Sequence, residues 1–294
     1  MKRVFILILS ILSVGLAVAQ PRSAVQRNDK PQVGIALSGG GALGFAHIGV
    51  LQALEENGIH PDCVAGTSMG AIIGVLYSAG YKPKEMLDIV LNKKLYQVKR
   101  LLTLQPAISS LGMSSHEVLY NALRQLIPHD SFDSLKIPFT VCVTNLDLVR
   151  PEYYSAGTNL ANYVVASASI PGAFEAKKID GTTYVDGGVL DNLPARQLHN
   201  NGCRYIIGVD VLPIVENMKK KNSIDIAIIS LRAMQHTNSI PGIEVCDWLI
   251  NSYALIEYHE FSFEQYREIY QYGYRATIDY INSHPDMVRK TAVK

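Results

Sequence analysis

Residues 33–44 read VGIALSGGGALG, and they indicate a strand, a glycine-rich turn and the start of a helix. The apolar run Val33–Leu37 predicts a buried strand, and Phe45–Glu56 predicts a helix that ends at Gly58. Glycines allow the turn between them to bend sharply with its amides facing outward. Because amides beside a helix N-terminus favour negative charge, this turn is suited to a phosphate or to a reaction oxyanion.

A second strand and helix follow, joined at Gly66-Thr67-Ser68-Met69-Gly70. Cys63–Thr67 predicts the strand, and Met69–Ala79 predicts a helix that stops at Gly80. Gly-x-Ser-x-Gly at such a junction is typical of a nucleophile elbow, in which a tight turn projects the serine hydroxyl. Chance alone would place this pattern in roughly one chain of this length in ten. Its position between a strand and a helix therefore carries the prediction that Ser68 is a nucleophile.

A dinucleotide-binding interpretation of the first glycine turn is disfavoured. That fold needs an acidic residue at the end of the second strand, to hold the ribose of the cofactor. The nearby acidic residue, Asp62, precedes the strand, and Ser68 stands at its end. Nicotinamide chemistry is thus the most distant of the functions considered.

Strands that alternate with helices predict an α/β fold, with a mostly parallel central sheet covered by helices on both faces. Further strands are predicted at Phe139–Asn145, Thr182–Val185 and Tyr205–Val211. Near the C-terminus, Ser262 and Gln265 have the spacing of a capping box, and apolar and aromatic residues then recur at helical spacing as far as Ile281. We expect one hydrolase-sized domain over residues 33–282, followed by a tail at 283–294.

The N-terminus is predicted to be an export signal. Lys2 and Arg3 precede an apolar run that ends in Ala17-Val18-Ala19, which favours cleavage after Ala19 and leaves residues 20–32 as a short leader. The protein is then expected in a bacterial periplasm or outside the cell, with no transmembrane segment after signal removal. Without Lys2 and Arg3, the 27 basic residues fall to 25, against 26 acidic ones, a balance that gives no reason to expect nucleic acid as a partner.

The cysteines are widely spaced and lie among apolar neighbours, at Cys63, Cys142, Cys203 and Cys246. No Cys-x-x-Cys pair or zinc-finger spacing is present. Export would permit disulfides, but the neighbours favour buried free thiols.

A serine hydroxyl needs a neighbouring group to accept its proton. His199 follows Asp186 in an order that would suit a Ser-Asp-His triad, but it falls in a predicted helix, Ala195–Asn200, that leads away from the Asp loop. His47 lies one turn into the first helix, which favours a packing or capping role. Asp186, after a strand and before Gly187 and Gly188, is the preferred base. Its site should be partly desolvated, because an ordinary Asp with a pKa near 4 is a weak base.

The ordered motifs GGGALG, GTSMG and DGG, together with Ser167–Gly172 and Asp191–Pro194, resemble the patatin-like phospholipase family. The resemblance covers about Val33 to Ile281. It implies a dyad of Ser68 as nucleophile and Asp186 as proton acceptor, without His, metal or other cofactor. It also implies an oxyanion hole from the amides of Gly39, Gly40 and Gly41, within motifs completed by Gly44, Gly66, Gly70, Gly187 and Gly188. The chain departs from the pattern at Leu43, where many members carry Arg or Lys.

The expected substrate is a lipid or a membrane surface, and the expected reaction is hydrolysis of acyl esters. Leu91–Met113 combines basic and apolar residues, so it fits a lid on an anionic lipid surface as well as it fits a half-buried helix. An acyltransferase or thioesterase on the same fold remains open, as does a noncatalytic lipid-binding protein. The simultaneous presence of Ser68 and Asp186 argues against the noncatalytic alternative.

Overall fold

A computed structural model of the protein describes residues 33–92, 115–212, 223–251, 253–260 and 262–292. All of these residues belong to one structural unit that spans residues 31–294. The predicted signal peptide and leader lie outside the described residues, as does most of the predicted lid Leu91–Met113.

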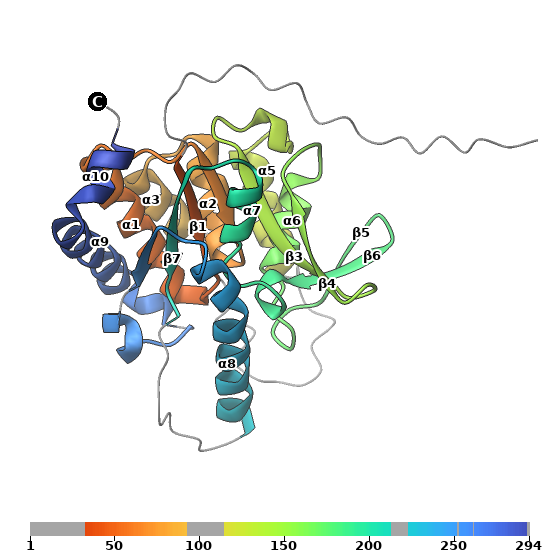
Figure 1. The fold of residues 1–294 in the computed structure, drawn as a ribbon. Helices are drawn as coiled ribbons and strands as arrows, with labels where there is room; N and C mark the ends of the chain where they lie inside the picture. Colours follow the sequence, from red (N-terminus) through yellow and green to blue (C-terminus); the bar gives the residue numbers. More distant parts are fainter. Residues whose placement is uncertain (1–32, 93–114, 213–222, 252, 261, 293–294) are drawn as a thin grey trace, which may run out of the picture. The chain divides into compact units, whose positions relative to one another are not determined.

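A mixed sheet with a parallel centre forms the middle of the unit (Figure 1). The pairs β2–β3, β1–β2, β1–β7 and β7–β8 are parallel, whereas β4, β5 and β6 add antiparallel pairs at the β3 side. The strands are β1 Val33–Leu37, β2 Cys63–Gly66, β3 Phe139–Asn145, β4 Arg150–Tyr154, β5 Lys177–Ile179, β6 Thr182–Asp186, β7 Tyr205–Asp210 and β8 Trp248–Asn251.

Helices cover both faces of this sheet. The α-helices are α1 Phe45–Glu56, α2 Met69–Ala79, α3 Pro83–Asn92, α5 Ser115–Leu126, α6 Leu160–Ser167, α7 Ala195–Asn200, α8 Ser223–Ile243, α9 Tyr266–Ser283 and α10 Pro285–Thr291. Short 3-10 helices are η1 Gly41–Gly44, η2 Phe132–Ser134, η3 Gly187–Val189, η4 Tyr253–Glu257 and η5 Phe263–Gln265. The predicted three-layer α/β/α architecture is confirmed.

The alternation of side chains along β1 explains the layers. Ile35 and Leu37 are fully buried in a large apolar cluster with α1, α2 and α9, whereas Ala36 joins a smaller cluster with Leu198 of α7 on the opposite face. Because successive side chains of a strand point to opposite faces, a strand that is apolar at every position must be covered on both sides. This matches the burial of all five residues of β1.

Strand β3 brings two distant segments together along one of its sides. Val141 pairs with Gly66 of β2 and with Tyr154 of β4, while Val143 pairs with Asp186 of β6 and with Glu152 of β4. Since β4 occupies one side of β3 throughout, β2 and β6 must share the other. β2 is parallel to β3 and β6 is antiparallel to it, so their carboxyl ends meet.

The C-terminal region differs in two details from its prediction. Ser262 and Gln265 do not form a capping box, because the Ser262 hydroxyl accepts the His259 amide at 2.9 Å and α9 begins at Tyr266 with no side-chain cap. Residues indicated only as a tail contain α10, whose Met287 is fully buried.

The prediction of four free thiols is wrong for Cys63 and Cys203, which form a disulfide. Cys63 lies opposite Gly34 on β1, and a Cβ at Gly34 would lie 3.0 Å from the Cys203 sulfur. The missing side chain at Gly34 therefore leaves room for the bond on that face of the sheet. Cys142 and Cys246 are free.

Candidate active site

The glycine turn after β1 is held by contacts from three other segments. The Ser38 amide donates to the Val209 carbonyl of β7, and the Gly39 amide donates to the Asn192 carbonyl at 3.2 Å. On the far side of the turn, the Ala42 amide donates to the Glu260 carbonyl at 2.8 Å. The loop is thus fixed by β7, by the segment after the Asp186 loop, and by the segment before α9.

His47 supports this turn from within α1. Its Nε2 donates to the Ser38 carbonyl at 2.8 Å, and its side chain is fully buried. Burial lowers the pKa of His47 to about 4, against the opposing effect of that hydrogen bond. His47 is therefore neutral at pH 7 and acts as a fixed donor that orients the Ser38 peptide, a capping role of the kind the sequence suggested.

Ser68 stands at a sharp turn between β2 and α2. Its backbone has φ 54° and ψ −122°, a conformation that a non-glycine residue adopts only under strain. A strained serine at a strand-to-helix turn is the geometry of a nucleophile elbow. Only 4% of Ser68 is exposed, so a reacting carbonyl must enter a largely dry site.

Close packing explains the glycines on both sides of the turn. A Cβ on any of the predicted motif residues Gly44, Gly66, Gly70, Gly187 and Gly188 would lie within 3 Å of another atom. At Gly70 it would lie 2.2 Å from the Leu37 carbonyl oxygen, so the start of α2 could not pack against the end of β1. This approach places the elbow next to the glycine turn.

Ser167 holds the backbone of Ser68. The Ser68 amide donates to the Ser167 hydroxyl at 2.9 Å, and that hydroxyl donates to the Cys142 carbonyl of β3 at 2.6 Å. Ser167 is fully buried at the end of α6. The sequence had marked Ser167 only as part of a family motif, because its partner is 99 residues away.

Asp186 ends β6 and faces the same site. Its amide donates to the Ser169 carbonyl at 3.0 Å, and its Oδ1 accepts the Gly188 amide at 2.8 Å. Its Oδ2 is buried and has no hydrogen-bond partner among the described residues. One carboxylate oxygen is thus used to hold the group, and the other remains able to accept a proton.

The surroundings make Asp186 a stronger base than an ordinary aspartate. Burial raises the pKa of Asp186 to about 7, while the Ser68 hydroxyl and the Gly188 amide act in the opposite direction. Ser68 and Asp186 lie on either side of the Asn192 amide oxygen. A Cβ at Gly39 would be 3.1 Å from Ser68 Cβ and 2.5 Å from that oxygen, and a Cβ at Gly188 would be 3.1 Å from Asp186 Oδ1 and 2.7 Å from the same oxygen. A base with a pKa near the working pH is the most effective in general base catalysis.

The three predicted oxyanion donors are not equivalent in the structure. The Gly39 amide is already used by the Asn192 carbonyl, whereas the amides of Gly40 and Gly41 donate to no acceptor within the described residues. The Cα of Gly39 nonetheless lies beside the nucleophile, since a Cβ there would be 3.1 Å from Ser68 Cβ. Gly40 and Gly41 are therefore the available donors of the turn.

Asn192 was not predicted as a site residue, but its side chain lies between the two glycine loops. Its Oδ1 would be 2.5 Å from a Cβ at Gly39 and 2.7 Å from one at Gly188. Its Nδ2 donates to the Ser239 hydroxyl of α8 at 3.1 Å. The Asn192 side chain therefore packs between the glycine turn and the Asp186 loop. This position depends on contacts between segments far apart in the chain, so no local sequence pattern indicates it.

A buried ion pair supports the outer end of the glycine turn. Arg232 of α8 binds Glu260 with Nε and Oε1 2.5 Å apart, and both side chains are largely buried. The same Glu260 gives its carbonyl to Ala42, and a Cβ at Gly41 would lie 2.4 Å from that oxygen. Arg232 therefore supports the glycine turn indirectly, by holding Glu260 in place. Within the turn itself, Leu43 stands where many members of the family that the sequence resembles carry a basic residue.

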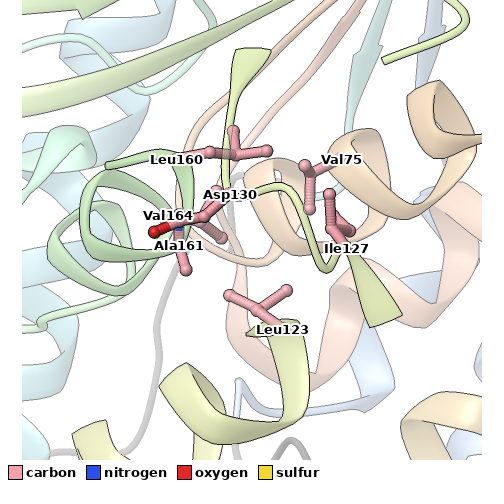
Figure 2. Close-up of a pocket in the computed structure, with 7 residues that line it drawn as sticks. All are labelled: Val75, Leu123, Ile127, Asp130, Leu160, Ala161 and Val164. Carbon is pink, nitrogen blue, oxygen red and sulfur yellow. The ribbon is translucent and has the colours of Figure 1, made fainter. Parts of the chain in front are cut away.

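Two other features lie apart from the site. His199 is exposed on α7, as expected for a residue outside the dyad. The pocket shown in Figure 2 lies between α2, α5 and α6, and Asp130 at its edge already binds the Arg124 guanidinium and the Ala161 amide. It contains neither Ser68 nor Asp186. Among the described His, Cys, Asp and Glu side chains, no group of three is arranged to hold a metal ion.

Comparison with known proteins places this geometry in a family. A family model for patatin-like phospholipase matches residues 35–199. An uncharacterized NTE family protein of Mycobacterium bovis is 37% identical over 172 residues, which cover 58% of this chain and 46% of that protein. The lysophospholipase NTE1 of Kluyveromyces lactis is 26% identical over 287 residues, covering 85% of this chain and 19% of that one. The chain thus matches less than half the length of these relatives.

A solved structure shares the fold. VipD from Legionella pneumophila has a TM-score of 0.52 at 17% identity, covering 87% of this chain and 67% of that one. Within the described residues, no helix combines the length and hydropathy needed to cross a bilayer. The matched family model spans more than half of the 294 residues, and the chain therefore belongs to the patatin-like phospholipase family.

Proposed function

We propose that this chain is a lipid ester hydrolase that uses Ser68 as its nucleophile and Asp186 as its base. The observation that carries the proposal is the pairing of a strained serine with a neighbouring, fully buried carboxylate whose pKa is raised to about 7. Among the described residues, no histidine forms a hydrogen bond with Ser68: His47 bonds to Ser38, and His116 bonds to Ser169. A direct Ser–Asp dyad fits this arrangement.

In the first step, the Ser68 oxygen attacks the ester carbonyl carbon while Asp186 takes the hydroxyl proton. The carbonyl oxygen becomes an oxyanion, which the free amides of Gly40 and Gly41 stabilise. Collapse of this intermediate breaks the bond to the alcohol, which leaves with the proton from Asp186. The acyl group is then an ester of Ser68.

In the second step, Asp186 takes a proton from water as the water oxygen attacks the acyl-enzyme. The second oxyanion collapses, the Ser68 oxygen leaves and recovers the proton, and a fatty acid is released. Each step uses the same base and the same donors, so no further group is required. Loss of one oxyanion donor typically costs about 100- to 1000-fold in turnover.

The lipid nature of the substrate is supported by the family and by one relative. The family model is that of patatin-like phospholipases, and the relative from Kluyveromyces lactis is named a lysophospholipase. A nucleophile that is 4% exposed also suits an ester delivered from an apolar phase, because water is excluded when the acyl chain enters.

The test uses the purified chain with a fluorophosphonate probe, followed by fatty-acid release from mixed phospholipid vesicles. Ser68→Ala should lose labelling and release, and Asp186→Asn should lose release. Two controls are matched in position and chemistry. Ser78 is a buried serine later in α2 whose hydroxyl has no partner among the described residues, and Asp191 is a nearby half-buried carboxyl whose pKa is also raised, to about 6.

Ser78→Ala should keep both activities, and Asp191→Asn should keep most of them. A parent chain that binds lipid but neither reacts with the probe nor releases acid would leave a lipid-binding protein on a hydrolase fold. Release of a new ester when an alcohol is added, or preferential cleavage of acyl thioesters, would identify a transferase or a thioesterase instead.

We also propose that the protein is exported after cleavage behind Ala19. The basic start and short apolar run support an export signal, and the Cys63–Cys203 disulfide is typical of proteins in oxidising compartments. N-terminal sequencing of the secreted or periplasmic protein tests this proposal, with Gln20 as the expected first residue. An N-terminus at Met1 or Lys2 would contradict it.

A further inference from the structure

Helix α8 presents an uncharged face to solvent along the part whose side chains the structure describes. Every exposed residue of this helix whose side chain the structure describes is uncharged. These residues, called here the α8 outer face, are Ile226, Ser230, Ala233, Met234, Thr237, Ile240 and Pro241. The exposed fractions of Ile226, Met234 and Ile240 are 54%, 36% and 42%. A surface helix normally presents charged and polar residues to water, so this composition is unusual.

Several polar residues of α8 face the protein, although Ser230 and Thr237 belong to the α8 outer face. Arg232, Gln235 and Ser239 are buried, and Arg232 and Ser239 contact the glycine turn and Asn192 through the bonds described above. Asn238 donates its Nδ2 to the Val189 carbonyl of η3 at 2.6 Å. The buried side of α8 thus carries polar side chains. Through them it contacts Glu260, Asn192 and the Val189 carbonyl, which lie around the candidate site.

The remaining exposed large hydrophobic residues of the described chain lie at the same edge of the sheet. Leu146, Leu148 and Val149 follow β3, Ile256 follows β8, and α8 is the next described element after β7. Strands β1, β2, β3, β7 and β8 are parallel, so their carboxyl ends form one edge. The glycine turn and Ser68 leave from that edge too. In Figure 1, α8 extends toward the bottom of the view, whereas the β3–β4 hairpin lies at the right side of the sheet.

The tip of the β3–β4 hairpin is held in a strained conformation. Val149 has φ 50° and is 75% exposed. A β-branched residue in the left-handed region is strained, and such strain is concentrated at functional positions. The hairpin therefore keeps Leu148 and Val149 toward solvent in a conformation that local preferences oppose.

We propose that the α8 outer face docks on a lipid surface, with the hairpin residues Leu146, Leu148 and Val149 as a second apolar contact at the same edge of the sheet. The proposal rests on the proposed function, since it explains how an ester leaves a bilayer for a nearly buried serine at the same edge. A lipid surface is favoured over a protein partner because the α8 outer face offers no charge or ion pair to select a partner, only apolar and small neutral groups. Contiguous apolar exposure of this kind marks an interaction site.

The experiment measures co-sedimentation with phosphatidylcholine vesicles. Ser68→Ala is used as the background, so that binding is scored without turnover. Ile226→Glu/Met234→Glu should lower the vesicle partition coefficient more than tenfold. The matched control is His60→Glu/Asn200→Glu, which changes two exposed residues on segments that precede β2 and β7, at the opposite edge of the sheet. The control should bind like the background. Binding should change less than twofold between about 50 and 500 mM NaCl, because the α8 outer face is uncharged and the Arg150 guanidinium of the hairpin is paired with Glu152.

A second arm uses active protein on a water-soluble short-chain ester and on the vesicles. The Ile226→Glu/Met234→Glu chain should keep its rate on the soluble ester and lose at least tenfold on vesicles. If the parent binds vesicles but cleaves neither substrate, the proposed function fails while the docking face stands. Equal vesicle binding by both double variants, or no binding by the background, would overturn the docking proposal. A parent dimer in light scattering that Ile226→Glu/Met234→Glu converts to monomer would do so as well, by assigning the face to a second copy.

Discussion

The strands that carry Ser68 and Asp186 run toward each other along one side of β3. Gly66, two residues before the nucleophile, pairs with Val141, and Asp186 pairs with Val143. This register brings a parallel strand and an antiparallel strand end to end, so that residues 118 positions apart in the chain share one site. The remaining parts of the site are arranged around this junction, and each gives a measurable expectation.

The rate of ester cleavage should fall as the pH drops through about 7. The base must be unprotonated to accept the Ser68 proton, and burial raises the pKa of Asp186 to about 7. Below that pH, kcat/KM should decrease about tenfold per unit. His47 adds no limb to the profile above pH 5, because burial keeps its pKa near 4. A profile that stays flat from pH 5.5 to about 8.5 would be inconsistent with Asp186 as the base.

Asp186→Asn should abolish turnover and yet stabilise the fold above pH 7. The pKa of Asp186 is higher in the folded chain than its ordinary 3.8, so the folded state binds a proton that the unfolded state releases. Stability of the parent is therefore lost as the pH rises from about 4 to 7, by a few kcal/mol. Urea unfolding at pH 4 and 8 measures this. The free energy of unfolding of the variant should exceed that of the parent at pH 8 and approach it at pH 4. An equal difference in this free energy at both pH values would contradict the raised pKa of buried Asp186.

Ser167→Ala should lower the reactivity of Ser68, although it leaves the Ser68 side chain unchanged. The substitution leaves the Ser68 amide buried without an acceptor, which costs about 1–3 kcal/mol of stability. Because the elbow backbone is then less well held, the rate of fluorophosphonate labelling should fall at least tenfold at a temperature where the variant is folded. Ser283→Ala, an exposed serine at the end of α9, is the control and should leave both values unchanged. Normal labelling of folded Ser167→Ala would exclude a positioning role.

The Arg232–Glu260 pair should behave as a coupled unit. Either Arg232→Met or Glu260→Leu alone leaves a buried charge without this partner, which typically costs about 3–5 kcal/mol. The double variant should be more stable than the sum of the single effects predicts, with a coupling energy of at least about 1 kcal/mol. Chemical denaturation of the four proteins completes the cycle. Additive single effects would show that the two groups act independently.

The disulfide should be detectable by counting thiols. In denaturant without reductant, two of the four cysteines should react with a thiol reagent, and all four should react after reduction. Cys63→Ser and Cys203→Ser should each add one free thiol to the unreduced count, since the partner is released. Either change should lower the free energy of unfolding, typically by about 2–4 kcal/mol. Four reactive thiols in the unreduced parent would contradict the pairing.

Much of the local structure was predictable because it depends on short-range rules. Apolar runs of strand length, helical periodicity and glycine punctuation located β1, α1, β2, α2, β3, β6 and β7 to within a residue or two. The strand–turn–helix context predicted the strained turn at Ser68, since a nucleophile elbow is defined by neighbours in the chain. The antiparallel strands β4 and β5 and the parallel strand β8 were missed, because short half-buried strands carry weak patterns.

The sequence by itself determined the types of residue available for chemistry and their order: an amide-rich turn, a serine at an elbow and an aspartate after a strand. Only the tertiary structure decided which of them work together. It assigned the Gly39 amide to the Asn192 carbonyl, joined Ser68 to Ser167, bonded Cys63 to Cys203 across Gly34, and buried Arg232 of α8 against Glu260. These outcomes depend on desolvation and on contacts between residues far apart in the chain. Both quantities arise only when the layers pack, so no local pattern of residues contains them.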